Sequence, residues 1–294
     1  MSDSLNKQKI VCVVGPTASG KTSFAIEYAE KHNGEIISCD SMQIYKYMDI
    51  GTAKATKEEQ ARIPHHMIDF LDPNVDYSVA DFVSNVRGCI DEISSRNKLP
   101  ILCGGTGLYI DSIINNIQFS EEKRDDNYRA ELWELYEKKG AEYLHKLLEE
   151  ADPTEAEKVH QNNVKRVIRA LEICKTSGMT KTEADKEAVK EPIYDAEIYG
   201  LIMEREKLYE RINKRVDIMM ENGLLEEVKH LLDMGVRRNS TAMQAIGYKE
   251  IVEYLDGSCT LDEAVDKIKQ ESRRYAKRQM TWFKRNKAIK WIEV

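Results

Sequence analysis

Residues 9–22 read KIVCVVGPTASGKT, a short apolar run that leads directly into a glycine-rich turn. The turn, Gly15 to Thr22, fits the phosphate-binding pattern G-x-x-x-x-G-K-(S/T). Residues 9–14 are typical of a buried strand, and residues 21–32 are typical of a helix. This order is the context that the pattern requires, so the stretch predicts a strand, a phosphate loop and a helix.

The chemistry of such a turn follows from its glycines and its flanking helix. The glycines let backbone N–H groups point at phosphate oxygens, and the helix presents its positive end to the anion. Lys21 adds a point charge, and the Thr22 hydroxyl suits Mg²⁺, which we expect as a cofactor. Alone, the pattern predicts only that phosphates bind, and most proteins that carry it use ATP or GTP.

Further along the chain, strand and helix patterns alternate. Residues 35–39 (EIISC) and 100–103 (PILC) are typical of strands, and residues 82–94 between them are typical of a helix. The alternation predicts an α/β fold, a P-loop NTPase-like doubly wound parallel sheet whose ligand site lies at the carboxyl ends of the strands.

The middle of the chain has a different pattern. Residues 119–192 show no convincing strand, only charge-rich helical segments, and a strand pattern returns at 197–203. Helical patterns follow over 204–222, 224–234 and 261–283, with a last, edge strand expected at 289–293. We therefore predict a catalytic core of residues 1–118 and 198–294, interrupted by a helical insertion domain of residues 119–197.

Polar residues follow two of the expected strands. Asp40 follows the second strand, and the turn Gly104-Gly105-Thr106-Gly107 follows the third, so both should lie at the same rim as the phosphate loop. Asp40 could ligate Mg²⁺ through water or act as a general base, and a plain turn cap explains it equally well. Cys103 stands where an ATP hydrolase would carry a Mg²⁺-binding aspartate, which disfavours ATP hydrolysis.

For two further groups of residues, three arginines and two histidines, the sequence alone favours a structural role over a role in binding. Arg205, Arg211 and Arg215 could face the phosphates, but a solvated arginine face is the simpler interpretation. The adjacent His65 and His66 are expected to be structural rather than metal ligands.

Composition excludes several classes of protein. The 294 residues carry a net charge of −7, with no apolar run that could span a membrane, and we expect a cytoplasmic protein. The six cysteines have no C-x-x-C spacing, so neither a zinc site nor a redox motif is expected. The net charge argues against a nucleic-acid partner, yet residues 269–290 hold nine lysines and arginines against one acid.

Eight motifs together carry a resemblance that covers nearly the whole chain. The chain resembles the bacterial tRNA dimethylallyltransferases in GPTASGKT (15–22), SCDSMQIYKYMDIGTAK (38–54), PHHMIDFLDP (64–73), YSVADF (77–82), GGTGLY (104–109), KRVIRALEI (165–173), AIGYKE (245–250) and AKRQMTWF (276–283). The stretch after Asp40 is highly specific, because P-loop kinases in general do not have it.

The resemblance implies a different use for the phosphate loop. Dimethylallyl diphosphate is the donor, N6 of adenine 37 in tRNA attacks it, and diphosphate leaves. The insertion domain is implied to grip the anticodon loop. The implied catalytic residues are Asp40, as general base, with Lys21, Thr106 and Arg215. The implied diphosphate-binding residues are Gly15, Pro16, Thr17, Ala18, Ser19, Gly20, Lys21, Thr22 and Arg215, with Thr22 as metal ligand.

The resemblance also implies contacts with tRNA. Given these, we expect the basic run at 269–290 to contact the RNA backbone. The implied tRNA-binding residues are Asp40, Ser41, Met42, Gln43, Thr106, Arg129, Lys165, Arg166, Val167, Ile168 and Arg169. We expect a monomer that does not bind membranes.

Three other functions fit parts of the pattern. A P-loop kinase of a nucleotide or small metabolite explains the phosphate loop and the arginines, but not the run after Asp40. A prenyltransferase acting on free adenine nucleotides shares the core, and the insertion domain favours tRNA over it. A non-catalytic RNA-binding protein with a relic loop conflicts with the intact Lys21, Thr22 and Asp40.

Overall fold

The structure is a computed structural model that describes residues 7–119 and 125–294, which form two compact units. The first unit holds the residues up to Ile114 and from Pro192 onward, and the second is Asn115–Glu191. The predicted insertion, 119–197, extends further toward the C-terminus than the second unit, because the returning strand starts at Tyr194 rather than at 197.

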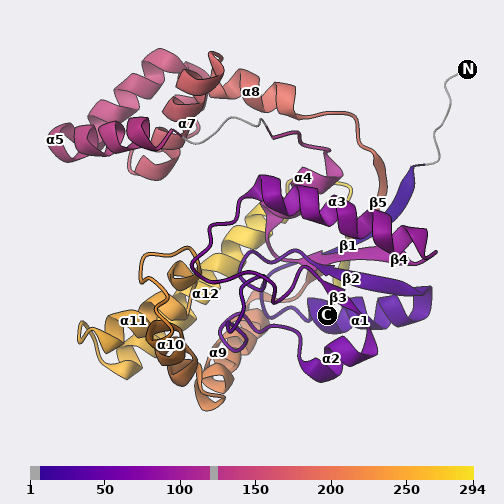
Figure 1. The fold of residues 1–294 in the computed structure, drawn as a ribbon. Helices are drawn as coiled ribbons and strands as arrows, with labels where there is room; N and C mark the ends of the chain where they lie inside the picture. The colour runs from indigo at the N-terminus through magenta and orange to yellow at the C-terminus, as the bar shows by residue number, and fades with distance from the viewer. Residues whose placement is uncertain (1–6, 120–124) are drawn as a thin grey trace, which may run out of the picture. The chain divides into compact units, whose positions relative to one another are not determined.

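The first unit is built on a parallel sheet, which confirms the predicted fold class (Figure 1). Within the described residues the strand order is β3-β2-β4-β1-β5-β6, and every neighbouring pair is parallel. The strands are β1 (Gln8–Val14), β2 (Gly34–Ser38), β3 (His65–His66), β4 (Leu99–Gly104), β5 (Tyr194–Ile202) and β6 (Lys290–Glu293). The predicted edge strand is therefore present as β6, while β3 was not predicted.

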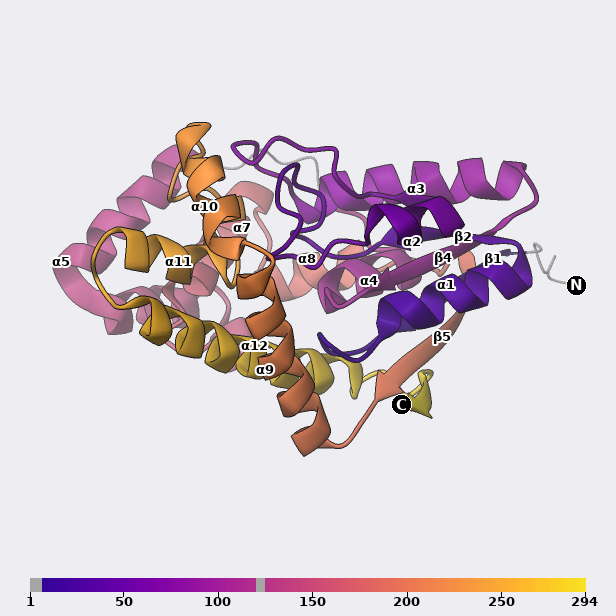
Figure 2. The same ribbon diagram turned by 90° about the horizontal axis from the view of Figure 1, so that it is seen from below.

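Helices cover both faces of this sheet. Helix α1 (Lys21–His32) and helix α3 (Val79–Ser95) lie on opposite faces in both views (Figures 1 and 2). Residues Ile10 to Val14 of β1 are fully buried because the strand is covered on both sides. The carboxyl ends of β1, β2 and β4 therefore meet at one edge, where the phosphate loop, Asp40 and Gly104 follow.

The C-terminal helices pack around the segment that follows β2. They are α9 (Arg205–Glu221), α10 (Leu224–Asp233), a short 3₁₀ turn (Ala242–Gln244), α11 (Tyr248–Leu255) and α12 (Leu261–Phe283). The three long ones match their predicted ranges within one residue. Ile44, Tyr45 and Met48 share a buried cluster with residues of α10 and α11. Two further helices, α2 (Lys57–Arg62) and α4 (Gly107–Ile114), were not predicted.

The regular structure in the described residues of the second unit is helical, apart from one isolated bridge between Ile117 and Val189. Its helices are α5 (Asp126–Ala151), α6 (Pro153–Ala156), α7 (Val164–Ser177) and α8 (Lys181–Ala188). Gly140 interrupts α5 with a φ of 82°, which divides it into two helices. The unit has its own core, which includes Leu144, Leu148 and Val167.

Gly104, at the end of β4, lies close against the backbone of Cys39, the residue that follows β2. A Cβ atom at this position would lie 2.2 Å from the Cys39 carbonyl oxygen. The Cys39 N–H donates to the Cys103 carbonyl at 2.8 Å, so the two backbones cannot part freely. We expect Gly104→Ala to lower the free energy of unfolding by roughly 3 kcal/mol, measured by urea denaturation.

Gly88→Ala on the exposed face of α3 is the matched control. A Cβ atom there would have no neighbour within 4 Å, and alanine favours a helix over glycine by about 1 kcal/mol. We expect this variant to be slightly more stable than the wild type. Equal stability of Gly104→Ala and Gly88→Ala would contradict the close approach of β2 and β4.

Candidate active site

The phosphate loop joins β1 to α1 and folds tightly on itself. Gly20 has a φ of 92°, in the left-handed region, directly before α1. Lys21 Nζ donates a hydrogen bond of 2.7 Å to the Pro16 carbonyl, so its side chain folds back along the loop. The loop lines a cavity of about 680 Å³, called here the loop cavity.

The charge in this cavity is predominantly positive. Burial lowers the pKa of Lys21 from its usual 10.5 to about 8, with nearby Arg215 lowering it further and Asp40 opposing the change. Burial also lowers the pKa of Arg215, again opposed by Asp40. Two largely desolvated cations therefore share one carboxylate, and an anionic ligand would restore the balance.

Arg215 comes from α9 and reaches the phosphate loop from outside the sheet. Its guanidinium donates to the Thr17 hydroxyl at 3.4 Å. Arg211 and Lys214 of the same helix also line the loop cavity, whereas Arg205 lies over the Tyr209 ring at 5.1 Å. Of the three arginines that could face the phosphates, the structure brings two to the cavity.

Asp40 and Thr106 lie together at the rim, as the predicted strand ends require. Asp40 Oδ1 accepts the Met42 N–H at 2.9 Å, and Thr106 Oγ1 accepts the Ser41 N–H at 3.3 Å. The Thr106 N–H in turn donates to the Cys39 carbonyl at 3.3 Å. Asp40 thus caps a turn with one oxygen, and it also lines the loop cavity, where a ligand can reach it.

A second cavity, of about 350 Å³, meets the loop cavity at Asp40. It is lined by residues of α9, α12 and the segment before α11, with apolar side chains such as Ile212, Met219 and Ile246. Residues that line both cavities are Thr17, Asp40, Thr52, Arg215 and Tyr275. Two ligands, one in each cavity, would therefore meet beside Asp40.

Gln279 of α12 ties the two glycine-rich loops together, and sequence reasoning missed it. Its side-chain oxygen accepts the Thr17 N–H at 2.8 Å, and its amide donates to the Gly105 carbonyl at 3.0 Å. A Cβ at Gly105 would lie 2.1 Å from this amide nitrogen. The only sequence signal was its place in the motif at 276–283.

Tyr275, one helical turn before Gln279, was also missed. Burial raises the pKa of Tyr275 to about 12, and the charge of Asp40 adds to the effect. Its hydroxyl therefore stays protonated at neutral pH, at the junction of the two cavities.

The side chain of Gln43, a predicted tRNA contact, is used inside the protein. Its oxygen accepts the Ser38 hydroxyl at 2.9 Å, and its amide is 3.2 Å from both the Thr52 and Ala53 carbonyls. Gln43 also lines the loop cavity, so it fastens the wall of the site to the end of β2.

His65 and His66 form the edge strand β3. His66 bonds to the Glu35 carboxylate at 2.6 Å, and Arg96 and Lys98 each reach that carboxylate at 2.7 Å. Burial alone would raise the pKa of Glu35, but these three partners hold it at about 2. His65 lines the loop cavity, a position that sequence reasoning did not anticipate.

The other predicted tRNA contacts lie in the second unit. Arg129 and Arg169 both pair with Glu172, at 2.9 and 2.6 Å, and the Glu172 side chain is fully buried. Lys165 and Arg166 are exposed on α7. Val167 and Ile168 are 0% and 2% exposed and their side chains pack in the core of this unit, which leaves only their backbone for the predicted contact with tRNA.

Comparison with known proteins decides the family. Residues 43–286 match the family model of the IPP transferases, and residues 8–73 match that of the isopentenyl transferases. The chain belongs to the IPP transferase family. Within the described residues of this family member, no helix is both long enough and apolar enough to cross a bilayer.

Relatives of this IPP transferase resemble it over nearly its full length. The tRNA dimethylallyltransferase of Bacillus subtilis (strain 168) is 52% identical, over 98% of this chain and 91% of its own. A crystal structure of the tRNA isopentenylpyrophosphate transferase of Bacillus halodurans has 47% identity and a TM-score of 0.73, covering 98% of this chain and 90% of that one. A eukaryotic dimethylallyltransferase acting on tRNA has 30% identity and a TM-score of 0.82, covering 97% of this chain and 74% of that one.

Proposed function

We propose that this IPP transferase moves a dimethylallyl group from dimethylallyl diphosphate to N6 of adenine 37 in tRNA. The observation that carries the proposal is the meeting of two cavities at Asp40, one with a cationic phosphate loop and one with apolar walls. The relatives named as tRNA dimethylallyltransferases support the choice of donor and acceptor.

The loop cavity would hold the diphosphate. Backbone N–H groups of residues 18–22 and the positive end of α1 favour an anion there. Lys21 supplies a point charge, and Arg215 can approach the diphosphate with two parallel N–H groups. Because both cations are desolvated, their attraction for a bound anion is stronger than it would be in water.

Mg²⁺ fits this cavity as a partner of the diphosphate. The Thr22 hydroxyl lines the cavity and is a hard oxygen ligand of the kind that Mg²⁺ prefers. No cluster of three acidic, histidine or cysteine side chains in the described parts of the chain is placed to hold a metal alone. Thr22, diphosphate oxygens and water would therefore hold the ion, whose charge would offset that of the leaving group.

The proposed reaction is a substitution at the allylic carbon. The N6 nitrogen forms a bond to that carbon, the carbon–oxygen bond to diphosphate breaks, and N6 loses a proton. Asp40 lies where the cavities meet and would accept this proton, a contribution of about 10²- to 10⁴-fold. Lys21 and Arg215 would stabilise the departing diphosphate.

The acceptor would be an unstacked base from the anticodon loop. Extrusion of a base from a single-stranded loop costs less than extrusion from a duplex.

Arg278 of the basic run at 269–290 lines the second cavity, while Lys269 pairs with Asp217 and Arg274 pairs with Glu271. We infer that residues 115–191 grip the anticodon stem-loop and that the chain works as a monomer.

The proposed tRNA contact of the second unit gives a testable prediction for two exposed basic residues of α7. Lys165→Ala with Arg166→Ala should weaken tRNA binding roughly tenfold at ~0.1 M salt, because two phosphate contacts are lost. The slope of log Kd against log salt should fall by about 1.5. Filter binding with unmodified tRNA at several salt concentrations measures both quantities.

Lys138→Ala with Lys146→Ala removes the same charge from α5, where both lysines pair with exposed glutamates, and serves as control. An unchanged slope in the Lys165/Arg166 variant, or an equal change in the control, would contradict a specific tRNA contact on α7.

A transfer assay separates the proposed function from its competitors. The protein is incubated with radiolabelled dimethylallyl diphosphate and unmodified tRNA, with the same donor and AMP, and with labelled ATP and candidate acceptors. Label from the prenyl donor should enter tRNA and not AMP. Label transfer from ATP alone would favour a kinase, and prenylation of AMP alone would favour an enzyme of free nucleotides.

A further inference from the structure

A loop of residues 49–54 forms part of the boundary between the two cavities. Thr52 lines both cavities, Gly51 lines the second, and Ala53 lines the loop cavity. The Thr52 hydroxyl donates to the Met48 carbonyl at 2.5 Å, which fixes its rotamer. The position of this loop therefore sets the shape of the junction where two ligands would meet.

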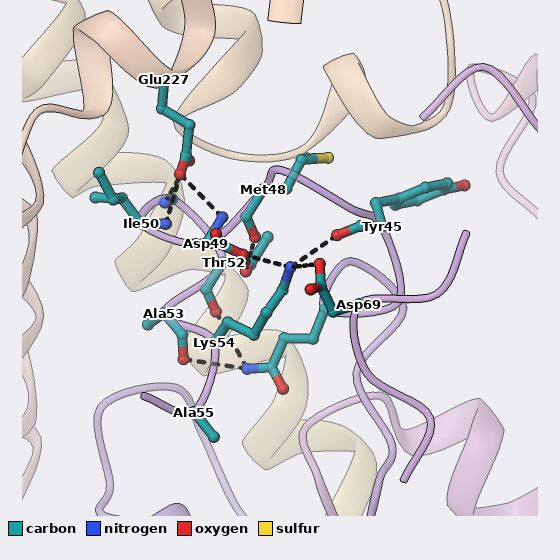
Figure 3. Close-up of polar contacts among 12 residues, drawn as sticks. Tyr45, Met48, Asp49, Ile50, Thr52, Ala53, Lys54, Ala55, Asp69 and Glu227 are labelled. Carbon is teal, nitrogen blue, oxygen red and sulfur yellow. Dashed lines mark hydrogen bonds and ion pairs between the residues drawn. The ribbon is translucent and has the colours of Figure 1, made fainter. Parts of the chain in front are cut away.

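One carboxylate from a distant helix holds the start of this loop. Glu227 of α10 accepts three successive backbone N–H groups, from Asp49, Ile50 and Gly51, at 2.9, 2.8 and 3.0 Å (Figure 3). Three adjacent N–H groups form a concave anion-binding site, which an internal carboxylate fills here. Such charge-assisted hydrogen bonds are about twice as strong as neutral ones.

The same carboxylate is anchored to the core through Tyr248 of α11. The Tyr248 hydroxyl donates to Glu227 Oε1 at 2.6 Å, and the Tyr248 side chain is fully buried. A Cβ at Gly51 would lie 2.5 Å from the Tyr248 ring, so the loop rests directly on this residue. Burial, reinforced by Glu227, raises the pKa of Tyr248 well above its usual value, so the hydroxyl remains a donor.

The end of the loop, at Lys54, is held by residues of its own segment between β2 and α3. The buried Lys54 donates to the Tyr45 carbonyl at 2.8 Å and pairs with Asp49 and Asp69 at 2.5 and 2.8 Å (Figure 3). These partners all lie in the segment between β2 and α3. Glu227 therefore supplies the charged hydrogen bonds by which the C-terminal helices hold the loop, beside the packing of Gly51 on Tyr248.

We propose that Glu227 is a positioning residue for prenyl transfer, holding loop 49–54 so that Gly51 and Thr52 shape the passage between donor and acceptor. The inference rests on the proposed function. Glu227 is not among the residues that line either cavity, so it acts through the loop and not on the substrates.

Glu227→Gln separates this role from direct binding. Glutamine has nearly the same shape, but one acceptor oxygen becomes an N–H donor that faces other N–H groups. A displacement of about 1 Å between reacting groups can cost about 10²-fold in rate. We expect the rate constant of transfer to fall about 10- to 100-fold, while KM for the donor stays within about twofold, because Lys21 and Arg215 do not contact Glu227.

The measurement is a single-turnover assay with enzyme in saturating excess over labelled tRNA, since its rate constant does not depend on the fraction of folded enzyme. Glu226→Gln, on the exposed side of the same helical turn, removes the same charge and should behave as wild type. Gly51→Ala pushes the loop away from the Tyr248 ring while the Glu227 side chain itself is unchanged, and should reproduce the loss of rate. Tm is recorded for every variant.

A wild-type rate constant in both Glu227→Gln and Gly51→Ala would overturn the inference. A raised donor KM with an unchanged rate constant would also overturn it, because it would make Glu227 a binding residue. Wild-type protein that transfers no prenyl group would instead refute the proposed function, so the two failures are distinguishable.

Discussion

Asp40→Asn should lower the rate of prenyl transfer by about 10²- to 10⁴-fold and leave donor binding nearly unchanged. Asparagine keeps an oxygen that can accept the Met42 N–H, so the turn at the rim is preserved. It cannot accept the proton of N6, because its amide has no comparable basicity. Single-turnover rates measure the loss, and Kd for dimethylallyl diphosphate checks that the loop cavity is intact.

Asp72→Asn is the matched control for this variant. Asp72 makes the same kind of turn with the Asn74 N–H, at 2.8 Å, on an exposed part of the first unit. It lines neither cavity described above, so its substitution should leave the rate unchanged. An Asp40→Asn variant that retained the wild-type rate would remove the general base from the mechanism.

Lys21→Ala should lower the rate of transfer by about 10²- to 10³-fold, because it removes a desolvated charge from the position where diphosphate departs. Donor affinity should fall as well, since the proposed role of Lys21 places it against the donor before the reaction too. Lys31→Ala, at the exposed end of the same helix, removes an equal charge and should have no effect.

Because the pKa of Lys21 is lowered, kcat/KM for the donor should depend on pH near neutrality. The ammonium is charged below about pH 8 and becomes neutral as the pH rises through that value. In the wild type, kcat/KM for the donor should therefore fall above about pH 8, approaching tenfold per unit. The decline should be absent in Lys21→Ala, and a flat wild-type profile through this range would contradict the assignment.

Much of the site could be predicted because its parts follow strands. The carboxyl ends of neighbouring parallel strands meet at one edge, so the loop after β1, Asp40 after β2 and Thr106 after β4 had to converge. Local patterns were enough for α1, α9 and α12, whose observed bounds match their periodic runs.

The positioning residues could not be predicted in this way. Gln279 and Glu227 come from helices more than 170 residues away from the loops that they hold, at separations of 262 and 178 residues for Thr17 and Asp49. Their roles depend on how helices pack, and glutamine or glutamate on an amphipathic helix normally indicates a solvated face.

The burial of the Val167 and Ile168 side chains can be read from the sequence. Val164, Val167, Ile168 and Leu171 have the spacing of a buried helical stripe. The flanking Lys165, Arg166 and Arg169 lie on the other face of α7 and are the residues that RNA can reach.

In the proposed reaction, the loop cavity holds a prenyl donor and the acceptor reaches Asp40 through the second cavity. The most direct measurement is mass analysis of nuclease fragments from tRNA treated with the protein, dimethylallyl diphosphate and Mg²⁺. We expect the fragment containing adenine 37 to gain the mass of one five-carbon prenyl unit with wild-type protein and not with Asp40→Asn. Unmodified fragments with the wild type, or a prenyl gain that persists at the wild-type rate in Asp40→Asn, would contradict it.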